Sequence, residues 1–263
     1  ARFRQIQLPP ADLVIVDEAH CSLAKWFLWL FEQYRQAWFI GLTATPCRTD
    51  GRGLGDLYQG MVQAVLPSQA IREGYLVPTK VFAPYKPDLQ GVRVQNGDYV
   101  QDQLARRMDK PEIVGNVVEH WQRLALGKPT LVFASGVAHS MHIADEFNRA
   151  GIKAEHVDGK TDLAIRDGVW DRLRSGETKV VCNCNVATEG IDVPPVSCIQ
   201  DVRPTKSYIK FRQAAGRGQR PHPLKVNCLY LDHAGNVAQH GFPDADVDWN
   251  LEPGKKIQDS IRE

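Results

Sequence analysis

Leu13-Val-Ile-Val-Asp-Glu-Ala-His20 is the stretch of sequence from which the fold class can be inferred. Four apolar residues in succession are typical of a strand that is buried on both faces of a parallel sheet. The run ends in two carboxylates, Asp17 and Glu18. Open α/β sheets bind their ligands at the carboxyl ends of the strands. The stretch therefore predicts an α/β protein with a candidate site directly after this strand.

The rest of the chain alternates predicted strands and helices. A second buried strand is expected at 37–43, and from residue 130 onward the alternation is regular. This order predicts a parallel sheet with right-handed crossovers. The further expected strands are 130–134, 154–157, 179–183, 197–201 and 225–231, and the expected helices are 23–35, 68–73, 99–108, 111–126, 138–150, 164–175 and 208–215.

Composition excludes several classes of protein. The chain has 263 residues, is 43% hydrophobic and carries a net charge of +1, which is not the composition of a disordered chain. Its apolar runs fall far short of the roughly 20 residues that cross a bilayer, so no membrane partner is expected. The six cysteines lack metal-binding spacing and are expected as reduced thiols in a cytoplasmic protein.

Turn-forming residues divide the chain into parts. Residues 84–98 are rich in Pro, Gly, Asp and Asn and poor in apolar periodicity, which indicates a junction between domains. We therefore expect a first domain at 1–83 and a second at 99–243. The polar segment 244–263 receives no structural assignment.

The carboxylates after the first strand have a functional interpretation. Asp17 can hold Mg²⁺, a hard cation that prefers one or two carboxylates together with phosphate oxygens. Glu18 can orient or deprotonate an attacking water molecule. The alternative is an acidic strand end that precedes a helix, where carboxylates are favoured electrostatically.

Five segments, taken in order, resemble motifs II to VI of the superfamily 2 helicases. The sequence of these segments most resembles the RadD-like branch of bacterial and phage DEAD/DEAH helicases, especially at 41–55, 203–207 and 231–236. Each motif alone is a weak signal, whereas five in the right order form a strong one. The segments are Asp17–His20, Gly41–Pro46, Leu131–Ala134, Ala187–Pro194 and Gln213–Arg220.

The resemblance implies a fold and an activity. It implies two RecA-like domains, each a parallel sheet flanked by helices, with the first domain incomplete and the second complete. ATP and Mg²⁺ would bind between the domains. Hydrolysis would drive translocation or unwinding of single- or double-stranded nucleic acid, with DNA favoured over RNA and DNA repair among the pathways left open.

The resemblance also assigns roles in the first domain. Asp17 and Glu18 match the Mg²⁺-binding and water-activating carboxylates. His20 matches the residue that couples the ATP site to the second domain. Thr43 and Thr45 match the motif that links hydrolysis to movement of the nucleic acid.

In the second domain the resemblance assigns three further groups. Thr188 matches a contact to the nucleic-acid backbone, and Gly190 and Asp192 match positions near the nucleotide. The residues that match the motif reaching across to ATP are Gln213, Arg217 and Arg220.

The basic residues of the last motif support this role independently. Arg217 and Arg220 are three apart, so they share one face of a helical turn. Arginine offers phosphate a fixed fork of donors. Residues 203–225 contain seven basic side chains and no acidic one, which favours binding of phosphates, although a solvated basic surface is the alternative.

One expected element is missing from the sequence. The G-x-x-x-x-G-K-[ST] loop that cradles phosphates occurs nowhere in these residues. We therefore expect the carboxyl part of a longer helicase, with apolar surface exposed at 13–16 and 39–42 and with weak or no ATPase activity by itself. The alternatives are a non-catalytic module that binds nucleic acid or a partner, and a subunit that receives the P-loop from another chain.

Overall fold

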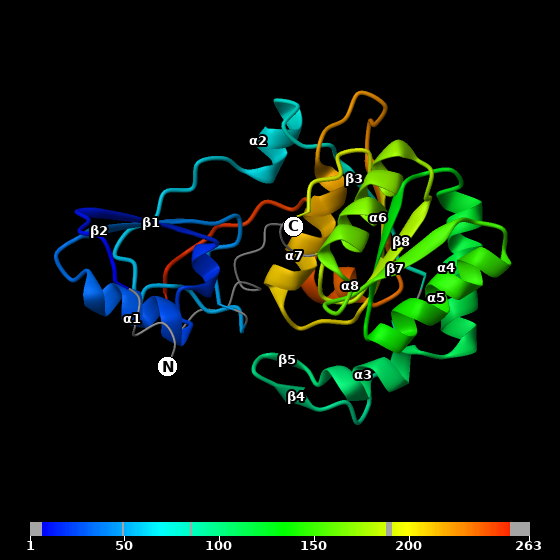
Figure 1. Ribbon diagram of the computed structural model, residues 1–263, viewed down its shortest axis with the longest axis horizontal. Coiled ribbons are helices and arrows are strands. Elements are labelled where there is room, and N and C mark those ends of the chain that lie inside the picture. Colours follow the sequence, from blue (N-terminus) through cyan, green and yellow to red (C-terminus); the bar gives the residue numbers. More distant parts are fainter. Residues whose placement is uncertain (1–6, 49, 85, 188–190, 253–263) are drawn as a thin grey trace.

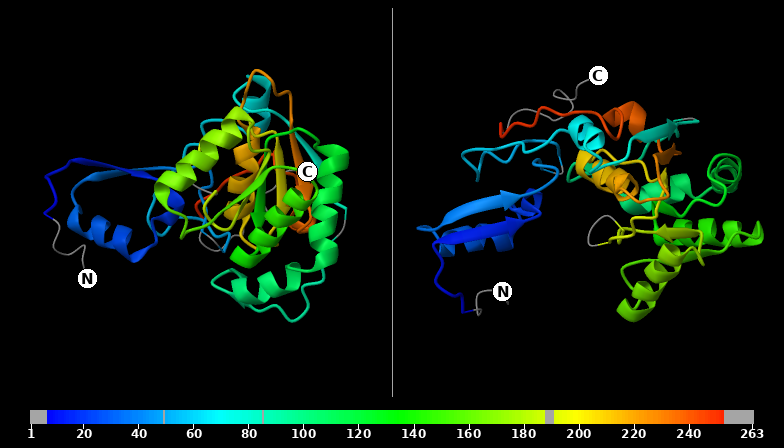
Figure 2. Two further views of the ribbon diagram at one scale, coloured as in Figure 1. Left: turned by 45° about the vertical axis from the view of Figure 1, so that its right-hand side comes forward. Right: turned by 90° about the horizontal axis from the view of Figure 1, so that it is seen from above.

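The computed structural model describes residues 7–48, 50–84, 86–187 and 191–252, which form a small lobe and a large lobe (Figure 1). The small lobe contains two parallel strands, β1 (Leu13–Asp17) and β2 (Trp38–Leu42), a short 3-10 helix, η2 (Ala19–Cys21), and an α-helix, α1 (Lys25–Gln33). The large lobe contains most of the remaining elements. The two lobes stand side by side in all three views (Figures 1 and 2).

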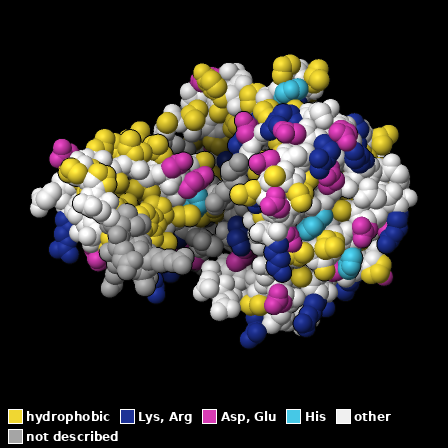
Figure 3. Space-filling model, viewed as in Figure 1, with side chains coloured by type: hydrophobic (Ala, Val, Ile, Leu, Met, Phe, Trp, Pro, Cys, Tyr) yellow, Lys and Arg dark blue, Asp and Glu magenta, His cyan; other side chains and the backbone are white. Residues whose placement is uncertain are grey.

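One face of the small sheet is covered and the other is bare. On the covered face, the ring of Phe39 stacks on Phe31 of α1 with centroids 4.1 Å apart. On the other face, Ile15 is 60% exposed and Trp38 is 80% exposed. The prediction that these strands are buried on both faces is wrong, because no second layer covers them among the described residues. The expectation of exposed apolar surface here is confirmed (Figure 3).

The large lobe is built on a six-stranded sheet in which every pairing is parallel. The strand order is β3-β10-β9-β6-β8-β7. The predicted parallel α/β architecture is thus confirmed for this lobe. The strands are β3 (Thr79–Phe82), β6 (Thr130–Ala134), β7 (Ala154–Val157), β8 (Val180–Asn183), β9 (Cys198–Val202) and β10 (Cys228–Asp232).

Helices cover both faces of the large sheet. Because successive side chains of a strand point to opposite faces, Leu131 and Phe133 of β6 join one buried cluster with α6 and α7, and Val132 and Ala134 join a second with α3, α4 and α5. The result is a three-layered α/β/α lobe. The helices are α2 (Pro67–Arg72), α3 (Gln101–Met108), α4 (Pro111–Leu124), α5 (Val137–Arg149), α6 (Leu163–Ser175), α7 (Tyr208–Gln219) and α8 (Asn236–His240).

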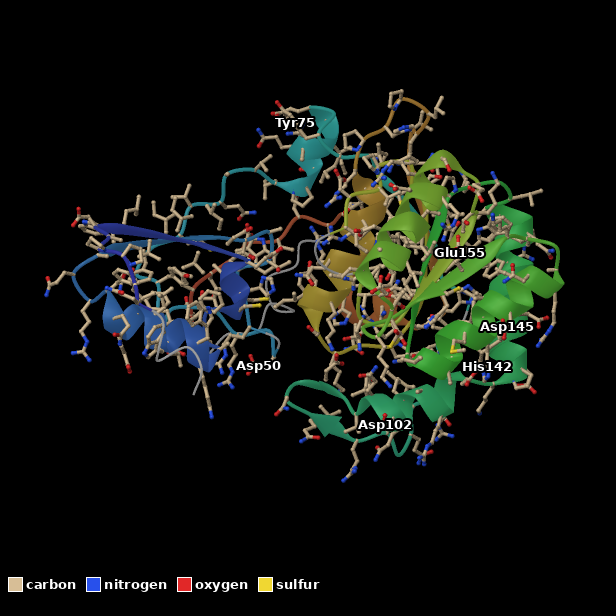
Figure 4. All side chains as sticks on the ribbon, viewed as in Figure 1. Asp50, Tyr75, Asp102, His142, Asp145 and Glu155 are labelled. Atoms are coloured by element: carbon tan, nitrogen blue, oxygen red, sulfur yellow. The ribbon has the colours of Figure 1, made fainter. Side chains whose placement is uncertain are left out.

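The chain passes between the lobes before residue 83. Strand β3 lies within the expected first domain, yet it pairs with β10 at the edge of the large sheet. The expected junction contains β4 (Val94–Gln95), which forms a hairpin with β5 (Asp98–Tyr99). A Cβ atom on Gly97, at the tip of this hairpin, would lie only 3.1 Å from Cα of Asp50. Asp50 belongs to the small lobe and is labelled in Figure 4.

The segment Asp244–Glu252, here called the C-terminal strap, runs from the large lobe back to the small one (Figure 1). Near its start, the Asp246 carboxylate accepts hydrogen bonds from the backbone N–H and the hydroxyl of Ser68, at 2.9 and 2.7 Å. Near its end, the carbonyl of Leu251 accepts from the N–H of Gly55 at 2.7 Å. The strap therefore contacts both lobes.

Candidate functional site

The first two candidate segments meet at one edge of the small sheet. Strands β1 and β2 are parallel, and Asp17 pairs with Leu42. Asp17, the last residue of β1, and Thr43, the first residue after β2, therefore lie at the same edge of the sheet. Glu18 has φ 50° and ψ 49°, a left-handed conformation that is uncommon outside glycine. Its N–H donates to Oδ1 of Asp17 at 2.9 Å. The chain thus turns sharply and keeps the two carboxylates at the strand end.

His20 connects this edge to the large lobe. Its Nδ1 lies 3.2 Å from Oε2 of Glu18 and 3.2 Å from Oγ1 of Thr43, and its side chain is only 6% exposed. Its Nε2 lies 3.4 Å from Nε2 of Gln213 on α7. With a proton assigned to Nδ1, the ring donates toward the Glu18 carboxylate and its Nε2 accepts from the Gln213 amide.

The two threonines of the second segment face inward. Oγ1 of Thr43 accepts the N–H of Thr45 at 3.1 Å in addition to its contact with His20. Thr45 is 3% exposed, and its own hydroxyl has no hydrogen-bond partner within the described part of the chain. A buried polar group without a partner is costly. Thr43 therefore belongs to the His20 network through its hydroxyl and Thr45 only through its backbone N–H, and the predicted link of both to nucleic-acid movement stays a prediction.

Helix α7 approaches the large sheet unusually closely at Gly218. A Cβ atom there would lie 2.2 Å from Sγ of Cys228 and 2.8 Å from Cγ1 of Ile199. Only glycine fits this contact. The close approach fixes the part of α7 on which Arg217 lies and after which Arg220 follows.

Arg217 and Arg220 converge on one backbone carbonyl. Their Nη1 atoms donate to the Ile191 carbonyl at 2.8 and 2.7 Å, and Arg220 also pairs with the Asp192 carboxylate. Arg217 lies in the last turn of α7, whereas Arg220 follows the helix with extended backbone, so the two arginines converge without sharing the predicted helical face. Asp192 itself is largely exposed, with 75% of its side chain accessible.

Gln213 and Arg217 are four residues apart on α7, so they lie on one face about 6 Å apart along the axis. The helix face that meets His20 therefore continues toward the arginines. Of the second-domain residues that the motifs singled out, Thr188 and Gly190 lie outside the described residues.

The basic stretch 203–225 does not form one exposed positive surface. Arg203 and Lys225 are buried, at 6% and 8% exposure. Lys210 donates to Oδ2 of Asp98 at 2.8 Å. Burial alone would raise the pKa of Asp98, but Lys210 and two further hydrogen-bond donors, the Lys206 N–H and the Thr205 hydroxyl, hold it below its ordinary value. Sequence reasoning missed Asp98, because it lies more than 100 residues from the cation that it binds.

The described residues contain no group of three or more His, Cys, Asp or Glu side chains arranged to hold a metal ion. All six cysteines are free thiols, and five of them are buried. Within the same residues, no helix is both long and apolar enough to span a bilayer.

The comparisons with known proteins confirm the resemblance to the superfamily 2 helicases. Residues 109–222 match the family described as "Helicase conserved C-terminal domain". The RadD-like branch is not distinguished by this match and stays a prediction.

Two curated relatives extend the similarity over most of the chain. A 51.5 kDa protein of a Lactococcus phage (isolate 7-9) is 34% identical over 95% of this chain and 55% of its own length. IRC3 of Saccharomyces cerevisiae, named as a candidate ATP-dependent helicase, is 29% identical over 89% of this chain and 35% of its own length. The chain thus spans about half or less of the relatives that it matches.

Two solved structures share the fold. The Type ISP restriction-modification enzyme LlaBIII bound to DNA superposes with a TM-score of 0.62 at 20% identity, covering 89% of this chain and 18% of its own. Dbp5 of Saccharomyces cerevisiae (L327V), bound to RNA and ADP BeF3, superposes with a TM-score of 0.55 at 14% identity, covering 90% and 57%. At these identities the likeness shows the fold alone, which confirms the RecA-like helicase architecture.

Proposed function

We propose that this chain is the carboxyl part of an ATP-dependent helicase or translocase. The observation that carries the proposal is the contact between His20 and Gln213. It places the helix that bears Arg217 and Arg220 against the lobe that bears Asp17 and Glu18. The carboxylates and the arginines of the proposed nucleotide site thus come from two different lobes, so the site is complete only when the lobes are in contact.

The carboxylates suit a hard cation. Asp17 is exposed at the carboxyl end of β1, and its oxygens and those of Glu18 are the ligand type that Mg²⁺ prefers. We assign both residues to the metal. When bound, Mg²⁺ would neutralise charge on the nucleotide phosphates. Glu18 also holds Nδ1–H of His20, so the water-orienting carboxylate and the interlobe contact are one hydrogen-bonded unit.

The arginines supply positive charge from the other lobe. In this structure they bind the Ile191 carbonyl and Asp192, groups that a nucleotide phosphate would replace or share. Because the arginines and the carboxylates belong to different lobes, hydrolysis would depend on lobe closure. An arginine that is supplied in this way contributes on the order of 10³–10⁵ to the rate of phosphoryl transfer.

The proposed nucleic-acid partner is DNA. The restriction-modification enzyme LlaBIII bound to DNA supports this choice, whereas Dbp5 bound to RNA represents the other outcome. Contacts to the sugar-phosphate backbone, including the one assigned to Thr188, would tolerate any sequence. We place the protein in the cytoplasm.

The phosphate-cradling loop would come from a segment that covers the bare face of the small sheet. Parallel sheets are normally covered on both faces. Here Leu13, Ile15, Trp38, Ile40 and Leu42 are all between 47% and 80% exposed. A P-loop-bearing segment with apolar helices or strands is the partner whose chemistry fits this face.

DNA-stimulated ATP hydrolysis tests the proposal. The chain is assayed alone and with an added P-loop-bearing amino-terminal segment, with and without single-stranded DNA or RNA. We expect turnover only in the complemented mixture, stimulated more by DNA. Arg220→Ala should lower it on the order of 10³-fold. Arg149→Ala is the matched control, because Arg149 makes only a surface ion pair with Glu146.

Other results would point elsewhere. ATP turnover by the isolated chain would contradict the assigned need for a P-loop. Binding of single strands without turnover in any mixture would favour the non-catalytic binding module. Equal loss of activity in both arginine variants would remove the special role of Arg220.

A further inference from the structure

A buried lysine, Lys225, joins the end of α7 to the 191–196 segment, which Arg217 and Arg220 also contact. Lys225 is 8% exposed, and its Nζ donates to three backbone carbonyls: Pro194 at 3.0 Å, Val196 at 2.8 Å and Gly218 at 2.9 Å. An ammonium group has three N–H donors. All three are therefore used, and each satisfies a carbonyl.

The positions of these carbonyls are informative. Pro194 and Val196 follow Ile191, whose carbonyl accepts from both arginines, and Asp192, whose carboxylate pairs with Arg220. Gly218 lies between Arg217 and Arg220 in the last turn of α7, where carbonyls lack partners within the helix. The arginines link the end of α7 to the Ile191 carbonyl and the Asp192 carboxylate, and the Lys225 ammonium links the same two segments through the Gly218, Pro194 and Val196 carbonyls.

We propose that Lys225 is a positioning residue that sets Arg217 and Arg220 for phosphoryl transfer. This inference rests on the proposed function. Gly218 fixes how closely α7 approaches the sheet, and Arg174 of α6 donates to the Asp192 carbonyl at 3.0 Å, but neither contact ties Pro194 and Val196 to the end of α7. The three hydrogen bonds of Lys225 supply that constraint, because they fix the segment against the end of the helix.

The charge of Lys225 is necessary for all three contacts. Burial, together with the nearby Arg220, lowers the pKa of Lys225 to about 8. Cys228 also faces it, but burial raises the pKa of that thiol to about 12, so the thiol is neutral near pH 8. A neutral amine has only two N–H donors. As the pH rises through about 8, one carbonyl must therefore lose its donor.

Three variants test the proposal in the complemented ATPase assay. Lys225→Met keeps the chain length and removes the donors, Lys225→Arg keeps a cation, and Lys153→Met is the control, since Lys153 forms an exposed ion pair with Glu177. We expect kcat to fall on the order of 100-fold in Lys225→Met, the cost of misplacing a catalytic group by about 1 Å. KM for ATP should change little, and Lys225→Arg should restore part of kcat.

The pH profile separates positioning from stability. The kcat of the wild type should decline as the pH rises through about 8, and Lys225→Arg should lack this decline. The same titration changes folding stability in the direction opposite to its effect on kcat. The folded pKa is lowered below that of the unfolded chain, so the unfolded state binds more protons between these values and stability rises with pH there. A decline in kcat would therefore not reflect unfolding.

Unchanged kcat in Lys225→Met, or an alkaline decline that persists in Lys225→Arg, would overturn the proposal. If the wild-type mixture hydrolyses no ATP, the proposed function fails, and hydrogen exchange then tests the positioning alone. Lys225→Met should accelerate exchange in 191–196 and 217–222 and leave 130–150 unchanged. Equal exchange in both proteins would show that the lysine does not hold these segments together.

Discussion

The side-chain amide of Gln213 lies 3.4 Å from Nε2 of His20, and the two residues are 193 positions apart in the chain. Because Nδ1 of the same imidazole contacts Glu18 and Thr43, one ring joins both candidate segments of the small lobe to α7. A change at either partner should therefore be transmitted to the other lobe.

A double-mutant cycle measures this contact. His20→Ala and Gln213→Ala should each lower the free energy of unfolding, and the double variant should lose less than the sum. We expect a coupling of about 0.5–1.5 kcal/mol, the range of a single neutral hydrogen bond. Urea titration of the four proteins provides the values. Additive effects would mean that the two side chains do not interact.

Gly53 should be essential for attachment of the C-terminal strap. A Cβ atom at this position would lie 2.4 Å from the backbone carbon of Leu251, so Gly53→Ala forces the strap away from the small lobe. We expect a loss of about 1–3 kcal/mol, typical of overpacking, and faster proteolysis within 244–252. Gly60→Ala is the control, because nothing lies within 4 Å of its Cβ position. Equal effects of both substitutions would refute the assigned contact.

His233 should make the protein sensitive to acid. Burial, and the stacked ring of His120, lower the pKa of His233 to about 3. The folded state therefore excludes a proton that the unfolded state binds below about 6.5, so stability is lost as the pH falls through that range. His233→Phe should flatten the fall between pH 6.5 and 4 in thermal denaturation.

Asp201 changes stability with pH in the direction opposite to His233. Comparison of the wild type with His233→Phe separates the two contributions. Burial raises the pKa of Asp201 to about 6, so its contribution to stability is present at low pH and is lost as the pH rises through that value. Asp201 is unchanged in His233→Phe, so the difference between the variant and the wild type reports His233. Parallel pH curves would contradict the assignment.

Polar substitutions on the bare face should improve solution behaviour and abolish complementation. Trp38 and Ile40 are 80% and 47% exposed, so Trp38→Ser with Ile40→Thr should reduce self-association at little cost in stability. The same double variant should lose binding of the P-loop-bearing segment. Sedimentation velocity with and without that segment measures both effects. Undiminished binding would exclude this face as the docking site.

The regular part of the fold could be predicted from the sequence because its signals are local. Strands such as 130–134 are short apolar runs between helical patterns, and the structure places β6 at those residues. Helix α7 extends four residues beyond the predicted end at 215, because the small residues Gly216 and Gly218 resemble a helix stop. At Gly218, close packing on the sheet accounts for the glycine instead.

Long-range contacts could not be predicted in this way. The pairing of β3 with β10 joins residues about 150 positions apart, and nothing near Thr79 indicates its partner. The same holds for Asp98, whose cation Lys210 lies 112 residues away. Motif resemblance identified the candidate residues of the site. The contacts that hold them, such as those of Lys225, depend on backbone carbonyls that have no signature in sequence.

The strap changes the mechanics of the pair of lobes. The chain crosses between them once ahead of β3 and again along Asp244–Glu252. Two bodies joined by one thread can rotate about any axis, whereas two separate crossings leave free rotation only about the line that connects them. Relative movement of these lobes is thus restricted toward rotation about one axis, and the positions of the two crossings fix the direction of that axis.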